Sequence, residues 1–272
     1  EKKMTRPDRP VQWYAFGCSG FGPTHESLVI HHYALDYRPD VVVMVFIAND
    51  PWDSSIYLAP QEPSMARFEL DADDQLFLVP PTQYVPSLLK RFSANFAVVR
   101  SFMIQKCIYR PGLAPGTAGG HSVRAVTADA ATQPASLPNQ MRVARTWKLI
   151  EKVLERTQRD CADRGAVFAL AWEGHRYKIE AALAGQTYRP PPGEDDPFCE
   201  SARWFELEYL YLRRFTAKLN IPFLGLADAM IEKVRSTKQL HHFPDDAHWN
   251  RVGHEAVGEA FARWIETLLP KK

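Results

Sequence analysis

The sequence predicts an α/β domain built on a parallel sheet with helices on both faces. Three observations support this fold class. Short apolar runs alternate with longer amphipathic stretches, which is the order of a parallel sheet and its crossover helices. The run VVVMVFI at residues 41–47 is continuously apolar and mostly β-branched, as expected for a strand buried on both faces. The chain has 272 residues, 46% of them hydrophobic, which is enough for one large core.

A strand, a helix and a second strand form the first predicted unit. Residues 11–16 (VQWYAF) are a short β-prone run that ends at the segment GCSGFG. We expect Thr24 to cap a helix that continues to residue 37, where an Arg-Pro-Asp sequence ends it. The strand at residues 41–47 follows. The segment is therefore predicted to be a βαβ unit.

The remaining elements are expected in the order of a parallel sheet, apart from two insertions. Residues 51–81 predict a loop with a small hairpin formed by residues 67–70 and 75–79. Helices are expected at residues 85–108, 140–164, 200–219, 227–235 and 251–269, and strands at residues 167–172 and 222–226. Residues 111–138 and 185–197 contain many Gly, Pro and small residues, which predicts surface loops. We expect one domain over residues 1–272, with insertions at residues 51–140 and 185–200.

Composition excludes some classes of function. Lys and Arg number 33 against 32 Asp and Glu, and the net charge of +1 gives no electrostatic case for a nucleic-acid partner. No stretch approaches the roughly 18 apolar residues that span a bilayer. The four cysteines are too scattered for a disulfide framework or a zinc motif, so they do not assign a compartment.

The sharpest chemical signal is the segment HHFPDDAHWNRVGH at residues 241–254. Asp245 precedes His248 by three residues, and an Asp at that distance can accept the Nδ1–H of the imidazole. This fixes the tautomer and leaves Nε2 for a nucleophile. Two alternatives remain open: Asp245 caps a turn while His248 packs, or the nearby histidines and aspartates bind a metal ion.

Two further signals follow predicted strands. Asn49 and Asp50 come directly after the strand at residues 41–47, and ligands of open α/β sheets bind where the strands end. An Asn there can direct its amide at a developing oxyanion, although the same dipeptide is also a common turn. Gly20, after the run at residues 11–16, offers a backbone N–H to a ligand. Ser19 in that loop suggests a nucleophile elbow, but Phe21 stands where the elbow needs Gly.

Together these blocks resemble the SGNH hydrolase superfamily, also called GDSL-type esterases and lipases. Gly20 in FGCSGFG matches the family Gly whose N–H contacts the oxyanion. Asn49 in FIAND matches the Asn of a GxND-like block, although Ile47 stands where the pattern has Gly. The final DxxHxN block is matched by Asp245, His248 and Asn250. The resemblance covers the chain from residue 11 to its end.

This resemblance implies a three-layer αβα, flavodoxin-like fold and Ser-His-Asp acyl transfer. The activity would be hydrolysis of a carboxylic ester or of a glycan O-acetyl ester. His248 would be the base, oriented by Asp245, while Gly20 and Asn49 would form the oxyanion hole. No metal or organic cofactor is needed. The partner would be a small-molecule or glycan ester, with no nucleic acid and no membrane span in this chain.

The family's nucleophile is missing from these residues. It lies in a GDS block after the first strand of the family, and this sequence has no such block; the Asp-Ser-Ser at residues 53–55 lacks the Gly and lies elsewhere. We therefore expect the first strand of the sheet and its serine to precede residue 1. Two alternatives remain: Ser19 or Cys18 is the nucleophile, or the chain is a catalytically inactive glycan- or ligand-binding relative.

Overall fold

The computed structural model describes residues 11–18, 20–58, 65–81, 139–174, 176–185, 202–243 and 248–269. Several sequence predictions lie outside these ranges. They include the helix at residues 85–108, the surface loop at residues 111–138 and nearly all of the loop at residues 185–197. Ser19 and Asp245 lie outside them as well.

The chain is a mixed α/β structure with a parallel sheet of three strands. These strands are β1 (Val41–Phe46), β4 (Val167–Trp172) and β5 (Phe223–Gly225), in the order β1-β4-β5. Val41 pairs with Val167 and Phe46 with Trp172, while Leu170 pairs with Phe223. The predicted strands at residues 41–47, 167–172 and 222–226 are confirmed.

Two strand predictions need correction. Residues 11–18 form neither strand nor helix, so the predicted strand at residues 11–16 is wrong. A β-prone run becomes a strand only where a neighbour completes its hydrogen-bond ladder, and no described strand pairs with this segment. The run at residues 41–47 is not fully buried on both faces: in β1 buried residues alternate with half-buried ones, so one face of the strand is less completely covered than the other.

The predicted hairpin is confirmed. β2 (Arg67–Leu70) and β3 (Leu76–Val79) pair in antiparallel fashion, outside the main sheet. The turn is held by Asp71, whose Oδ1 accepts hydrogen bonds from the backbone N–H groups of Asp73 (2.9 Å) and Gln75 (2.8 Å). Phe68 and Leu70 pack with Leu149 and Val153 in a small second core.

Most predicted helices in the described ranges are confirmed within a few residues. They are α5 (Asn139–Asp163), α7 (Ala202–Lys218), α8 (Ala227–Thr237) and α9 (Arg251–Leu268). The helix expected after residue 24 is α1 (Pro23–His32), followed by a 3-10 turn, η1 (Ala34–Tyr37). Its N-cap is Gly22 rather than Thr24, because the Thr24 hydroxyl donates to the Ser54 carbonyl instead.

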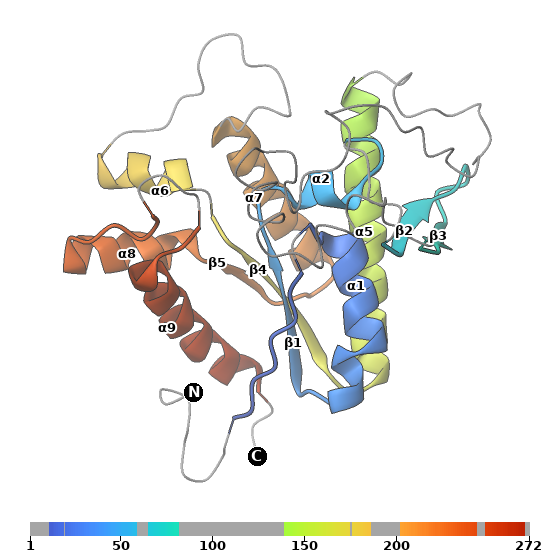
Figure 1. The fold of residues 1–272 in the computed structure, drawn as a ribbon, viewed down its shortest axis with the longest axis horizontal. Coiled ribbons are helices and arrows are strands. Elements are labelled where there is room, and N and C mark those ends of the chain that lie inside the picture. The colour runs from blue at the N-terminus through green and yellow to red at the C-terminus, as the bar shows by residue number, and fades with distance from the viewer. Residues whose placement is uncertain are drawn as a thin grey trace, which may run out of the picture.

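Two short helices fall where the sequence predicted no helix. They are α2 (Asp50–Ser54) and α6 (Arg176–Leu183), which follow β1 and β4. Figure 1 shows both at the ends where these strands finish, with α1 and α5 on one side of the sheet and α8 and α9 on the other. Buried side chains from the strands and from α5, α7, α8 and α9 form the main core. In the part of the chain that the structure describes, no helix is long and apolar enough to cross a membrane.

Candidate functional site

The carboxyl edge, where β1, β4 and β5 end, is where ligands bind in parallel sheets. Asn49 and Asp50 follow β1, and Glu173 follows β4. The backbone N–H of Glu173 donates to the carbonyl oxygen of Phe46 at 2.9 Å. The loops after the two strands therefore begin side by side, and their polar side chains share one edge of the sheet.

Asp50 builds the turn that presents Asn49. Its carboxylate Oδ2 accepts the backbone N–H of Ile47 at 2.9 Å, and its own N–H donates to the Ile47 carbonyl at 3.1 Å. Asp50 is completely buried, whereas Asn49 is exposed. The sequence thus located the turn correctly, and the structure divides the two roles: Asp50 holds the backbone, and Asn49 offers its amide.

The Asn49 amide already has one acceptor. Its Nδ2 donates to Oδ2 of Asp53, one turn further along α2, at 2.5 Å. Burial raises the pKa of Asp53, and the hydrogen bond from Asn49 acts in the opposite direction. An amide nitrogen carries two hydrogens. Asn49 can therefore donate a second hydrogen bond, to a ligand atom, without losing the first.

Gly20 lies in a tight turn closed by the hydrogen bond from Phe21 N–H to the Cys18 carbonyl, 3.2 Å. Its φ is +79°, and a Cβ at this position would meet no atom within 4 Å. Glycine is therefore required by backbone conformation rather than by lack of space. The residue is exposed, as a ligand-facing N–H requires.

Gly22 joins the Gly20 loop to the Asn49 turn. A Cβ on Gly22 would lie 2.6 Å from the Ser54 hydroxyl oxygen and 2.9 Å from the Asp50 carbonyl oxygen. Only a residue without a side chain allows this approach. The structure therefore brings together the loops of two predicted site residues that are 29 positions apart in the sequence. The sequence analysis gave Gly22 no role.

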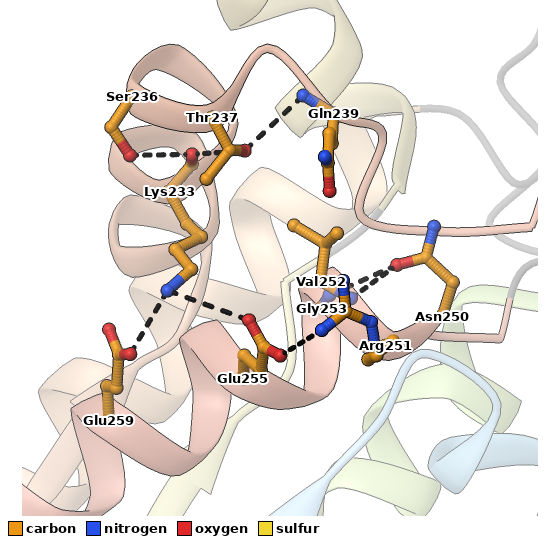
Figure 2. Close-up of polar contacts among 10 residues, drawn as sticks. All are labelled: Lys233, Ser236, Thr237, Gln239, Asn250, Arg251, Val252, Gly253, Glu255 and Glu259. Atoms are coloured by element: carbon orange, nitrogen blue, oxygen red, sulfur yellow. Dashed lines mark hydrogen bonds and ion pairs between the residues drawn. The ribbon is translucent and has the colours of Figure 1, made fainter.

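The His248 loop is organised by Asn250, the N-cap of α9. Its Oδ1 accepts the N–H groups of Val252 (2.9 Å) and Gly253 (3.2 Å), as Figure 2 shows. Its Nδ2 donates to the carbonyls of Leu240 (2.7 Å) and His242 (2.9 Å). One side chain thus ties the start of α9 to the segment before the motif.

Backbone packing further fixes this loop. A Cβ on Gly253 would lie 2.3 Å from the His241 carbonyl oxygen. His242 and Trp249 form an antiparallel bridge, and Phe243 N–H donates to the His248 carbonyl at 3.2 Å. Near this loop, Lys233 of α8 forms ion pairs with Glu259 (3.0 Å) and Glu255 (3.9 Å) of α9, and these ion pairs link the two helices (Figure 2).

His248 is exposed and acts on Glu173. Burial raises the pKa of the half-buried Glu173 carboxyl to about 7, and the charge of His248 lowers it. Arg176, shortly after the end of β4, donates a hydrogen bond from Nη1 to the Phe243 carbonyl at 3.0 Å, so the loop before α9 lies beside the chain that follows β4. The predicted hydrogen bond between Asp245 and His248 lies outside the described residues.

Four carboxyl groups interact beneath this edge: Glu26, Asp50, Glu173 and Glu208. Glu208 is buried and accepts a hydrogen bond from Trp172 Nε1 at 2.8 Å. Burial raises the pKa of Asp50 and of Glu208 well above the usual range, and that of Glu26 to about 7. Nearby carboxylates add to this, Glu26 on Asp50 and Glu173 on Glu208. These groups therefore hold protons at a pH where exposed carboxyls do not.

Sequence analysis missed three of these acids. Glu173 carries the same signal as Asn49, a polar residue directly after a buried strand. Glu26 and Glu208 lie on helices, and no sequence signal separated them from solvent-facing acids. Within the described ranges, no three His, Cys, Asp or Glu side chains are placed to hold a metal ion. The metal alternative for residues 241–248 thus gains no support from the described part of that segment.

Comparisons of the chain with protein-family models, with curated proteins and with solved structures gave no match. The site is therefore interpreted from its own geometry.

Proposed function

We propose that this chain carries the base and the oxyanion-binding groups of an SGNH-type ester hydrolase, on a three-layer, flavodoxin-like αβα fold. The proposed substrates are carboxylic esters, glycan O-acetyl esters among them. The observation that carries this proposal is the close packing of Gly22 on Asp50, which holds the Gly20 loop beside the Asn49 turn. Arg176, shortly after the end of β4, donates to the carbonyl of Phe243 in the loop that carries His248, which supports a single shared site.

Each residue has one role in the proposed reaction. A serine attacks the acyl carbonyl, and His248 Nε2 takes its proton, while the Asp245 carboxylate accepts the Nδ1–H and stabilises the imidazolium. The Gly20 N–H and the Asn49 Nδ2 donate to the oxygen that becomes negative in the tetrahedral intermediate. Collapse of the intermediate expels the alcohol, which takes the proton from His248. Water then releases the acid by the same steps.

A specific observation also favours a second function. The 272 residues contain no GDS block, and the Asp-Ser-Ser at residues 53–55 lacks its Gly. A binding protein that retains the site for esters or glycans needs no nucleophilic serine. The second candidate is therefore a catalytically inactive SGNH-like protein that binds glycans or other ligands.

Covalent labelling separates the two functions. A fluorophosphonate probe reacts with a serine only when a base activates it. We expect no labelling of Ser19 or Cys18 in residues 1–272, and labelling of one serine in a version extended upstream of Glu1. That labelling should be lost in His248→Ala and kept in His254→Ala, a histidine of α9. An extended, folded protein that is not labelled would favour the binding protein, and labelling of Ser19 would move the nucleophile to the Gly20 loop.

A further inference from the structure

We propose that Phe243 is a specificity-determining residue, whose ring contacts the apolar chain of an ester that is bound at His248. This inference deepens the proposed function and rests on it, because it selects esters with an apolar chain of several carbons over acetylated glycans. The surface that binds the chain is a property of the folded protein, so its affinity can be measured without catalysis.

The backbone places Phe243 directly opposite His248. The Phe243 N–H donates to the His248 carbonyl at 3.2 Å, next to the antiparallel bridge between His242 and Trp249. Residues that face each other across such a pair have Cβ atoms about 4.5–5.5 Å apart, and their side chains lie on the same side of the ribbon. Phe243 and His248 therefore share one side, and His242 and Trp249 share the other.

The burial of these residues agrees with the pairing. Phe243 is 51% exposed and His248 is exposed, whereas His242 is buried and Trp249 is half-buried. The side of the ribbon that carries the imidazole therefore faces outwards. Leu240, three residues before Phe243, is 54% exposed as well. The segment that leads to the proposed base thus presents apolar side chains at the surface.

The polar groups next to Phe243 are already paired within the protein. Arg176 Nη1 donates to the Phe243 carbonyl at 3.0 Å, and Arg176 Nε donates to Glu180 at 2.7 Å. Asn250 uses its oxygen for two N–H groups of α9 and its nitrogen for two carbonyls. The hydroxyl groups of a glycan lose free energy when they leave water without new partners. This surface therefore suits an apolar chain and not a sugar ring.

Binding of product acids to residues 1–272 tests the contact without catalysis. Acetate and octanoate are titrated, and the imidazole ¹H signals of His248, assigned by their loss in His248→Gln, report the binding. Each methylene that leaves water strengthens binding by up to about fourfold, so octanoate should bind more tightly than acetate. We expect Phe243→Ala to weaken octanoate binding roughly tenfold and acetate binding less than about twofold.

Phe77→Ala is the matched control. Phe77 is also exposed, but it lies on β3, on the side of the sheet away from α9 (Figure 1). Phe243→Leu keeps an apolar side chain and should retain most of the octanoate affinity. Octanoate that binds no more tightly than acetate, or that weakens equally in Phe77→Ala and Phe243→Ala, would overturn the inference. An equal loss for acetate and octanoate in Phe243→Ala would show a merely structural role and overturn it as well.

Hydrolysis of p-nitrophenyl acetate and p-nitrophenyl octanoate, by the version extended upstream, judges the proposed function separately. If octanoate binding depends on Phe243 but no ester is hydrolysed, the apolar contact stands and the hydrolase proposal falls. If hydrolysis depends on His248 while Phe243→Ala lowers kcat/KM equally for both esters, the contact falls and the hydrolase stands. With both correct, Phe243→Ala should raise KM for the octanoate ester and leave the acetate ester nearly unchanged.

Discussion

The backbone of Gly22 lies so close to Asp50 that a Cβ on residue 22 would be 2.9 Å from the Asp50 carbonyl oxygen. This approach joins two loops that the sequence connects only through a helix and a strand. Because backbone lies on both sides of the contact, neither loop can move without the other. The relative position of Gly20 and Asn49 therefore depends on this glycine.

Gly22→Ala should destabilise the fold and separate the two loops. The added methyl group must displace backbone or the Ser54 hydroxyl, and overpacking of this kind costs about 1–3 kcal/mol of unfolding free energy. Urea unfolding measures the cost. Gly17→Ala is the matched control, because a Cβ there meets nothing within 4 Å. Equal stability of the two variants would show that the close approach is not rigid.

Asn250→Ala should loosen the His248 loop. The change removes the acceptor for two N–H groups of α9 and the donor to two carbonyls. Loss of an N-cap costs about 0.5–2 kcal/mol, and the unpaired carbonyls add to this. Asn250→Asp keeps the cap oxygen but not the donor, so it should lower the melting temperature less than Asn250→Ala does. An equal decrease in melting temperature in both variants would assign the whole effect to the donor.

The unfolding free energy should depend on pH through the buried acids beneath the carboxyl edge. The folded-state pKa of Glu26 is raised to about 7 from its ordinary value near 4.5. The folded state therefore holds a proton that the unfolded chain releases, and this contribution is complete below about pH 4.5 and lost as pH rises to about 7. Burial lowers the pKa of His25 to about 4, which acts in the opposite direction over the acidic part of this range.

The variant Glu26→Gln separates the pH effect of Glu26 from that of His25. The glutamine cannot ionise, so the stability of the variant relative to wild type should increase as pH rises from about 5 to about 8, by roughly 3 kcal/mol in all. The measurement is urea unfolding at several pH values. Glu232→Gln, on an exposed position of α8, should show no such gain. A pH-independent difference between Glu26→Gln and wild type would contradict the burial of this carboxyl in the folded state.

Asn49→Ala should impair catalysis without impairing folding. The side chain is exposed and donates a hydrogen bond to its helical neighbour Asp53, so the unfolding free energy should change little. Loss of an oxyanion donor lowers kcat by roughly 10²–10³-fold. Asp53→Ala removes the acceptor but keeps the amide, so it should retain most activity in an ester assay. A large loss in Asp53→Ala with little loss in Asn49→Ala would reverse the two roles.

The sheet was predictable where the chain is continuously apolar. β1 and β4 are such runs, and both form strands. Residues 11–16 have a similar β-prone composition, yet they form no strand, because strand formation depends on a neighbour that the sequence cannot place. The short helices α2 and α6 were missed because each is too brief to show a helical period.

Candidate site positions could be predicted where a residue follows a strand or belongs to a motif. The sequence correctly placed Asn49 in a turn directly after β1. Glu173 carries the same signal and was overlooked. Glu208 lies on an amphipathic helix, where acids normally face solvent, and only the packing of Trp172 against it reveals its burial. The close approach at Gly22 could not be foreseen, because it joins segments that only tertiary folding brings together.

Turnover of p-nitrophenyl acetate tests most directly whether His248 is the base of an acyl-transfer site. Residues 1–272 should hydrolyse the ester poorly or not at all, because the GDS serine is missing from this sequence. A version extended upstream of Glu1 should hydrolyse it, and His248→Ala should abolish that activity. Removal of a triad member leaves only some 10³–10⁴-fold catalysis over water. Robust turnover by residues 1–272 that vanishes in Ser19→Ala, or a folded but inert extended version, would contradict this account.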